Sequence, residues 1–171
     1  MTNFEHYENA VAEHHKNIKI RTTPVSSWNF HYDMINEIKN SFIDFNTLEE
    51  IASDYKWNKP NWDIKNKLSE EVIIVTDAQL SIVFASQNIT KMNGYSPEEV
   101  IGKSPRMFQG KNTSAVVSKQ IRKAIQLKKP FEKKVLNYKK NGETYLCMIN
   151  GYPIYNENGE FSHFIAFEKV A

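Results

Sequence analysis

Residues 131–169 read FEKKVLNYKKNGETYLCMINGYPIYNENGEFSHFIAFEK, and this stretch decides the fold. It contains three runs rich in β-branched and aromatic residues, 131–138, 143–155 and 160–169, each long enough for a strand. Asn141-Gly142 and Asn158-Gly159 separate the runs, and Asn-Gly is the strongest short-range hairpin signal because both turn positions need positive φ. The segment therefore predicts a three-stranded antiparallel meander.

The sequence before the meander predicts two more strands and several helices. Short apolar runs at 72–75 and 80–85 predict a hairpin. A short helix is expected at 87–93 with Gly94 closing it, a second at 96–101 with Pro97 in its first turn, and the longest at 113–127. This order predicts an α+β fold, a five-stranded antiparallel sheet with helices on one face.

A helical extension is expected before the sheet, so we divide the chain into residues 1–69 and 70–171. The polar start carries His6, His14 and His15, whose spacing does not place two ligands on one helical face, and no metal site is predicted. Apolar residues at helical spacing then predict a helix from Ser27, and a capping-box pattern predicts a second from Thr47. The first helix has its apolar stripe at Trp28, Phe30, Ile35, Ile38 and Phe42.

Composition excludes several classes of function. The net charge of the 171 residues is +2, so no overall positive field favours nucleic acid or an anionic membrane as a partner. The single cysteine excludes an internal disulfide. The chain begins without the pattern of a secretory signal and contains no apolar run that could span a bilayer, so we expect a cytoplasmic protein.

Motifs for catalysis are missing from the sequence. There is no Gly-x-Ser-x-Gly elbow, no phosphate-binding glycine loop and no zinc-protease His-Glu pair. Cys147 and His163 are near in sequence, but that alone does not make a catalytic dyad. We predict that the chain is not an enzyme and has no catalytic residues.

The segment from Asn93 to Lys103, Asn-Gly-Tyr-Ser-Pro-Glu-Glu-Val-Ile-Gly-Lys, resembles the PAS family of signalling domains. The likeness covers residues 70–170 and includes the motifs around Phe131, Asn141 and Phe164. It implies a five-stranded antiparallel sheet that, with the helices between its second and third strands, encloses a small cavity or a packed core.

Within this family, residues 102–110, Gly-Lys-Ser-Pro-Arg-Met-Phe-Gln-Gly, are similar to the loop Gly-Arg-Asn-Cys-Arg-Phe-Leu-Gln-Gly of the flavin-binding light-oxygen-voltage branch. Arg106 and Gln109 match that loop, Arg122 matches the second arginine that grips the flavin phosphate, and Asn137 matches an asparagine facing the ring. Two guanidinium groups near one phosphate would make a sensible clamp.

The sequence also departs from this branch. Pro105 stands where the branch has its photoactive cysteine, so no cysteinyl adduct can form there. Ser104 and Cys147 replace two asparagines, and Glu168 replaces the glutamine that couples the ring to the sheet. A buried carboxylate beside the ring would be costly unless protonated or paired.

Each matched residue has a plain structural alternative. Arg106 and Arg122 can be surface cations, Gln109 can end a helix, and Asn137 can be an exposed strand residue. Cys147 can be a small core residue.

We therefore expect a PAS signalling module, bacterial in style, that binds a small ligand or a partner protein and passes a change to its N-terminal helices. The alternatives are a ligand-free dimerisation scaffold and a flavin mononucleotide (FMN) binding domain without cysteinyl photochemistry. The extension's apolar stripe needs a cover, either the outer face of the sheet or a second copy in a homodimer.

Overall fold

The structure is a computed structural model that describes residues 25–58 and 62–171, with side chains described from residue 32 onward in the first range. The chain forms two compact units, residues 1–35 and 36–171. In the first unit only the start of helix α2 (Val25–Asp54) falls in the described range. The three N-terminal histidines and the side chains of Trp28 and Phe30 lie outside the described residues.

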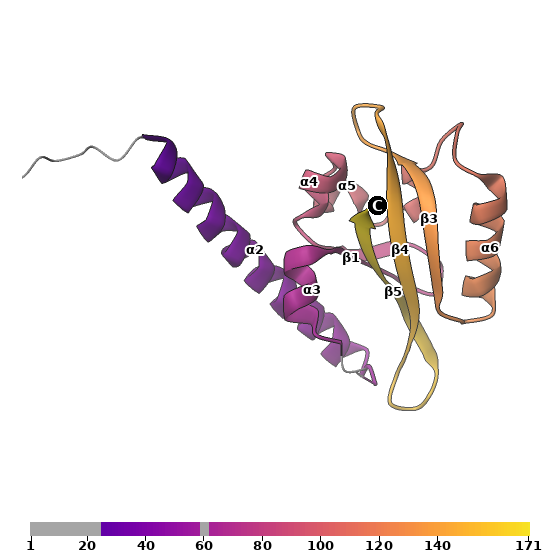
Figure 1. The fold of residues 1–171 in the computed structure, drawn as a ribbon. Coiled ribbons are helices and arrows are strands. Elements are labelled where there is room, and N and C mark those ends of the chain that lie inside the picture. The colour runs from indigo at the N-terminus through magenta and orange to yellow at the C-terminus, as the bar shows by residue number, and fades with distance from the viewer. Residues whose placement is uncertain (1–24, 59–61) are drawn as a thin grey trace, which may run out of the picture. The chain divides into compact units, whose positions relative to one another are not determined.

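The second unit is built on the predicted five-stranded antiparallel sheet. Its strands are β1 (Val72–Thr76), β2 (Ile82–Ala85), β3 (Phe131–Tyr138), β4 (Thr144–Tyr155) and β5 (Phe161–Val170). They lie in the order β2-β1-β5-β4-β3, so the first strand and the last are neighbours at the centre (Figure 1). The pairing of Val72 with Glu168 and of Ile149 with Glu168 fixes the register of β5 between β1 and β4.

Both Asn-Gly corners connect strands as predicted, but the turn type differs. Positive φ falls on the glycines alone, at 89° for Gly142 and 78° for Gly159. The Gly142 N–H donates to the Lys139 carbonyl, and the Lys139 N–H donates to the Glu143 carbonyl. Each corner is thus a three-residue loop with glycine in the left-handed region, which adds one residue to the two-residue turn that the sequence predicted.

Helices α4 (Ile89–Asn93), α5 (Pro97–Val100) and α6 (Ala115–Gln126), with the 3-10 helix η1 (Pro105–Phe108), connect β2 to β3. Gly94 ends α4 with a φ of 82°, as expected for a left-handed helix cap. The Ser96 N–H donates to the Glu99 side chain at the start of α5. Helix α6 packs beside the edge strand β3 (Figure 1).

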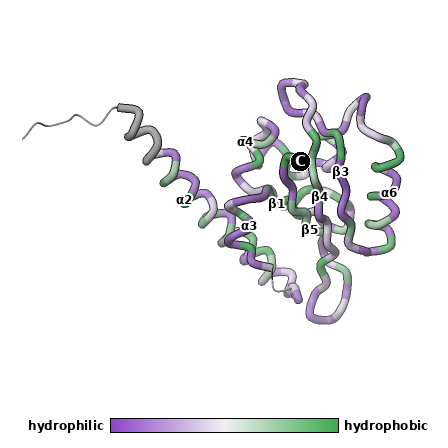
Figure 2. Tube along the Cα trace, viewed as in Figure 1, coloured by the Kyte–Doolittle hydropathy of each residue, from purple (hydrophilic) through white to green (hydrophobic). Residues whose placement is uncertain are grey.

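Helices cover both faces of the sheet, whereas the sequence predicted helices on one face and left the cover of the other face open. One core cluster joins inward residues such as Ile74, Phe108 and Cys147 to α4 and α5. A second joins Ile165 and Phe167 to the end of α2 and to α3 (Ile64–Glu70). Figure 2 accordingly shows hydrophobic residues concentrated in β1 and β5, the strands buried from both sides.

Helix α2 corrects the prediction of two helices before residue 56. It runs without a break from Val25 to Asp54, and Thr47 lies inside it. The residues between the two predicted helices include neither glycine nor proline, and the apolar stripe keeps its phase through Phe42, Phe45 and Leu48, so nothing ends the helix there.

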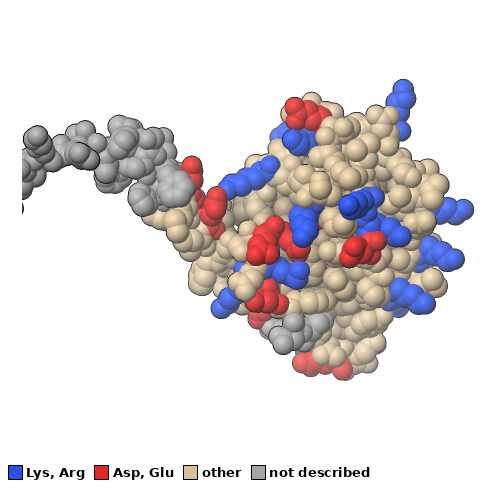
Figure 3. Space-filling model, viewed as in Figure 1, with Lys and Arg blue, Asp and Glu red and all other residues tan. Residues whose placement is uncertain are grey.

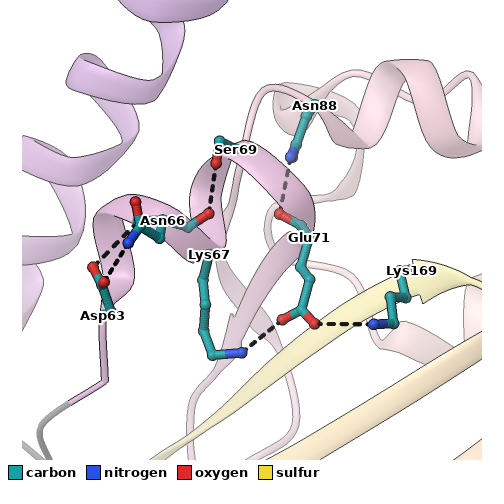
Figure 4. A network of polar contacts seen from close by, with 7 residues as sticks. All are labelled: Asp63, Asn66, Lys67, Ser69, Glu71, Asn88 and Lys169. Carbon is teal, nitrogen blue, oxygen red and sulfur yellow. Dashed lines mark hydrogen bonds and ion pairs between the residues drawn. The ribbon is translucent and has the colours of Figure 1, made fainter.

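A polar network fixes α3 against the sheet (Figure 4). The Glu71 carboxylate accepts from Lys67 at 2.9 Å and lies 3.7 Å from Lys169 of β5. Asn88 donates its side-chain amide to the Glu71 carbonyl at 2.9 Å. Glu71, the residue between α3 and β1, therefore connects α3, β5 and the segment that leads into α4.

Candidate functional site

A cavity of about 530 Å³ lies between the inner face of the sheet and the segment formed by η1 and α6. Its volume is within the range of small-molecule sites. Apolar side chains line most of it, among them Ile74, Phe108, Ile121, Phe131 and Ile149. The interior therefore contains a cavity. The sequence had left undecided whether it would be a cavity or a packed core.

The structure brings together five of the six residues that the resemblance assigned to a ligand. Arg106, Gln109, Arg122, Asn137 and Glu168 all line this cavity, although they come from five different elements or loops. Asn137 is 3% exposed, so the alternative of an exposed strand residue is wrong. Cys147 does not line the cavity, but it is fully buried behind the wall.

The exposed part of the cavity wall, which we call its mouth, carries two cations. Arg106 and Arg122 are exposed side chains that also line the cavity. Twelve Lys and Arg stand against one Glu between residues 103 and 140, a local excess that the net charge of the whole chain hides. Figure 3 shows these cations crowded over the part of the surface that β3 and α6 form. An anionic group is attracted to this side of the unit.

The buried part of the cavity wall holds an acid. Glu168 on β5 is 4% exposed, and burial raises the pKa of its carboxyl to about 7. The Cys147 thiol donates to Glu168 Oε2 at 3.5 Å, which partly offsets that effect. Burial, followed by the neighbouring Glu168, raises the pKa of the Cys147 thiol, so the thiol remains protonated.

Two further polar groups are buried near this acid. The Tyr145 hydroxyl and the Asn93 side-chain nitrogen make no hydrogen bond of normal geometry within the described ranges. Burial, with Cys147 and Glu168 adding to it, raises the pKa of Tyr145, while the facing side chains of Asn93 and Asn137 lower it. Buried donors without partners are rare, so this end of the interior has unused hydrogen-bonding capacity.

Two long-range contacts on the other side of the sheet were not predicted from the sequence. Asp44 of α2 is buried and accepts from the Gln87 N–H at 2.8 Å, and desolvation raises the pKa of its carboxyl to about 6. Trp57 donates its indole N–H to His163 Nδ1 at 3.2 Å, and burial lowers the pKa of His163. The two pairs are separated by 43 and by 106 positions in the chain, and no pattern in the sequence links residues so far apart.

Neither a metal cluster nor a membrane helix was found in the parts of the chain that the structure describes. There, no three His, Cys, Asp or Glu side chains are grouped as metal ligands would be. None of the helices between residues 25 and 171, the gap at 59–61 aside, combines the length and apolarity needed to cross a bilayer.

A five-stranded antiparallel sheet whose inner face and connecting helices enclose a ligand-sized cavity defines a sensor-type domain. The PAS domain model matches residues 70–169, which is more than half of the chain. The chain therefore belongs to the PAS domain family, and residues 70–169 are a sensory module of the kind found in signal-transduction proteins.

Among similar proteins, a blue-light-activated histidine kinase of Brucella canis is 36% identical over 85 residues, 50% of this chain and 17% of its own length. Phototropin-2 of Oryza sativa subsp. japonica is 33% identical over 111 residues, 62% of this chain and 12% of its own. The chain thus spans less than a fifth of these relatives.

A solved structure shares the fold at lower identity. The light-oxygen-voltage domain of the Erythrobacter litoralis EL346 blue-light activated histidine kinase superposes with a TM-score of 0.56 at 20% identity. The match covers 59% of this chain and 95% of that domain. The two proteins therefore share the fold.

Proposed function

We propose that the chain is a non-catalytic sensor that binds FMN in the inner cavity and passes the bound state to α2. The observation that carries the proposal is that the exposed Arg106 and Arg122 line the same cavity as the buried Asn137 and Glu168. A flavin with an anionic phosphate tail and a polar ring edge has the matching distribution of chemistry.

The residues present fit this cofactor. The two guanidinium groups would hold the phosphate, because their planar donors pair with phosphate oxygens. Asn137 and Gln109 would offer amide groups to the ring or its tail. The apolar walls would exclude water from the ring.

FMN, when bound, supplies visible-light absorption and redox chemistry, and the chain's own groups determine which bonds can form around it. Pro105 at the mouth of the cavity has no thiol. The only thiol, Cys147, is held toward Glu168 and stays protonated. The proposed sensor therefore works through hydrogen bonds and packing and forms no bond between Pro105 and the cofactor.

The first prediction concerns occupancy. The purified protein is expected to be yellow, or to become so with added FMN, and mass spectrometry of the released ligand should give the mass of FMN. FMN at about 100 times its dissociation constant should raise the free energy of unfolding by about 2.7 kcal/mol. A colourless protein that neither quenches FMN fluorescence nor gains stability would contradict the FMN proposal and favour the ligand-free scaffold.

Transmission to α2 is supported by direct contacts between that helix and the sheet. Leu48 and Ala52 of α2 are buried in the same cluster as Ile165 and Phe167 of β5, the strand that also carries Glu168. Asp44 adds a hydrogen bond to the backbone ahead of α4. A change in hydrogen bonding at Glu168 can thus alter the packing of a strand on which α2 rests.

We also propose that α2 mediates a homodimer. The stripe that buries Leu48 and Ala52 continues toward the N-terminus, where Ile38 and Phe42 are 61% and 65% exposed. Large apolar side chains in one stripe usually mark an interaction surface. A second copy supplies an identical stripe, so a symmetric contact can cover both.

The second prediction tests this surface. Replacing Ile38 and Phe42 together by serine should weaken the homodimer about 10- to 100-fold, as measured by sedimentation equilibrium, because apolar anchors carry most of the energy of an interface. Ile101→Ser is the matched control, since Ile101 is also half exposed but lies outside α2. A wild-type chain that is monomeric at every concentration would contradict the dimer.

The remaining expectations stay predictions. They are the boundary between residues 69 and 70, a bacterial source, a cytoplasmic location, and an unidentified signalling partner protein. The relatives that are named as kinases extend far beyond the matched segment, so any partner or output domain of this protein belongs to the same set of proposals.

A further inference from the structure

Among the residues that the structure describes, Glu168 is the one acidic side chain lining the cavity. It is also the position at which the light-oxygen-voltage branch has a glutamine. A glutamine amide can donate and accept at any pH, whereas a carboxyl group can donate only when it is protonated. The substitution therefore makes hydrogen bonding at this position depend on a proton.

No cation neutralises this carboxylate within the described part of the chain. The ion pairs there involve other acids, and Glu71 takes both Lys67 and Lys169 on the far side of the sheet. The ionisable groups that face Glu168 from β4 are the Cys147 thiol and the Tyr145 phenol, and both stay neutral.

On the cavity side, no charged group contributes to the raised pKa of Glu168. The two arginines at the mouth belong to exposed side chains, and the strand neighbours of Glu168 are Val72 and Ile149. The nearest partner is thus a thiol, and burial raises the pKa of Glu168 to about 7. Both protonation states are populated near neutral pH.

We propose that Glu168 is a proton-dependent specificity residue: its protonated carboxyl donates a hydrogen bond to the oxidised flavin ring, and flavin binding weakens when Glu168 ionises. The inference rests on the proposed FMN site. The polar edge of an oxidised flavin consists mostly of acceptors, carbonyl oxygens and ring nitrogens. An ionised Glu168 would present an acceptor to an acceptor in a buried space, which is unfavourable.

The sign of the pH dependence comes from linkage. If the protonated form binds flavin, binding takes up a proton at any pH above the pKa of the free site. The dissociation constant should then be nearly constant below about pH 6.5 and rise about tenfold per pH unit above about pH 7.5. The side-chain amides of Asn137 and Gln109 donate hydrogen bonds at every pH, so they do not contribute to the pH dependence of the dissociation constant.

The test is a titration of FMN and of riboflavin, monitored by quenching of flavin fluorescence, between about pH 6.5 and about pH 8.5. For the wild type we expect both dissociation constants to rise about 20- to 30-fold across this range. Riboflavin lacks the phosphate, so an equal slope for the two ligands assigns the effect to the ring end of the cavity.

Glu168→Gln should bind with the wild-type affinity measured at low pH and should lose the slope, because a neutral amide remains a donor. Cys147→Ser is the matched control, which keeps a hydroxyl donor beside Glu168 and should retain a slope. In the ligand-free protein, the wild type should show an infrared carbonyl band of a protonated, buried carboxylic acid that titrates near neutrality and is missing from Glu168→Gln, beside the band of Asp44 that both proteins share.

The outcomes separate this inference from the FMN proposal. Flavin binding with a flat pH profile in the wild type, or a slope that persists in Glu168→Gln, overturns the role of Glu168 and leaves FMN binding in place. Failure of both flavins to bind at any pH overturns both. A slope seen with FMN and not with riboflavin also contradicts the inference, since it would arise at the phosphate.

Discussion

Replacing Arg106 and Arg122 together by alanine is expected to weaken FMN binding about 100-fold and to leave riboflavin binding unchanged. Both side chains line the mouth of the cavity, and each offers charge-assisted hydrogen bonds to a phosphate. Because both are exposed to water, we assign them about 1.5 kcal/mol each, the low end for hydrogen bonds to charged groups. The measurement is fluorescence quenching of each flavin by the variant.

The matched control replaces Lys119 and Lys123 by alanine. These cations lie on the same helix as Arg122 and are exposed, but they do not line the cavity. They should change FMN affinity less than threefold, an effect of roughly 0.6 kcal/mol through the general field. An equal loss in both double variants would show that FMN senses only the basic surface and would contradict a phosphate clamp.

The largest effect on stability is expected at Glu168. Its pKa is raised from 4.5 to about 7 in the folded protein, so the folded state holds this proton more tightly than the unfolded chain does. The group therefore adds nothing unfavourable below about pH 4.5, costs stability as pH rises from about 4.5 to about 7, and costs about 3 kcal/mol above that range.

Glu168→Gln should accordingly raise the free energy of unfolding by about 3 kcal/mol at about pH 8.5 and change it little at about pH 4.5. Urea unfolding of the ligand-free protein at both pH values gives the difference. Asp44 and His163 also titrate, but they are present in both proteins, so their contributions cancel in the comparison.

Glu132→Gln serves as the reference for removing a carboxylate from an exposed strand position, and it should leave stability unchanged at both pH values. If Glu168→Gln raised the free energy of unfolding equally at low and high pH, the increase would come from better packing. That result would contradict the explanation by a buried charge.

The meander was predictable because its signals are local. The strands between 131 and 170 are rich in β-branched and aromatic residues, and the Asn-Gly pairs mark both corners within a residue of where the structure has them. The turn type was not predictable, because the choice between a two-residue and a three-residue loop depends on the twist and register of the paired strands.

The cavity residues were found through family resemblance, and physical patterns alone would not have found them. In the strands that contain Asn137 and Glu168, apolar and charged residues do not alternate. The sequence therefore does not show which face of the sheet these two side chains lie on. Burial of Asn137 and the contact between Cys147 and Glu168 appear only once β3, β4 and β5 are in register.

Contacts on the other side of the sheet were missed for a related reason. The sequence predicts a boundary between two helices near Asp44, yet this residue is the buried acceptor that connects α2 to the backbone at Gln87. Proximity in sequence draws attention to Cys147 as a neighbour of His163, but His163 pairs with Trp57. Polar contacts between residues far apart in the chain produce no periodic pattern in the sequence.

The unbroken course of α2 means that this helix has no hinge between the residues packed on the sheet and the exposed Ile38 and Phe42. An α-helix resists torsion because each turn is tied to the next by backbone hydrogen bonds. Rotation of α2 at Ala52 would therefore reappear as rotation of Ile38 and Phe42. The number of residues between the two ends sets the phase, and one residue more or less would turn the stripe by about 100°.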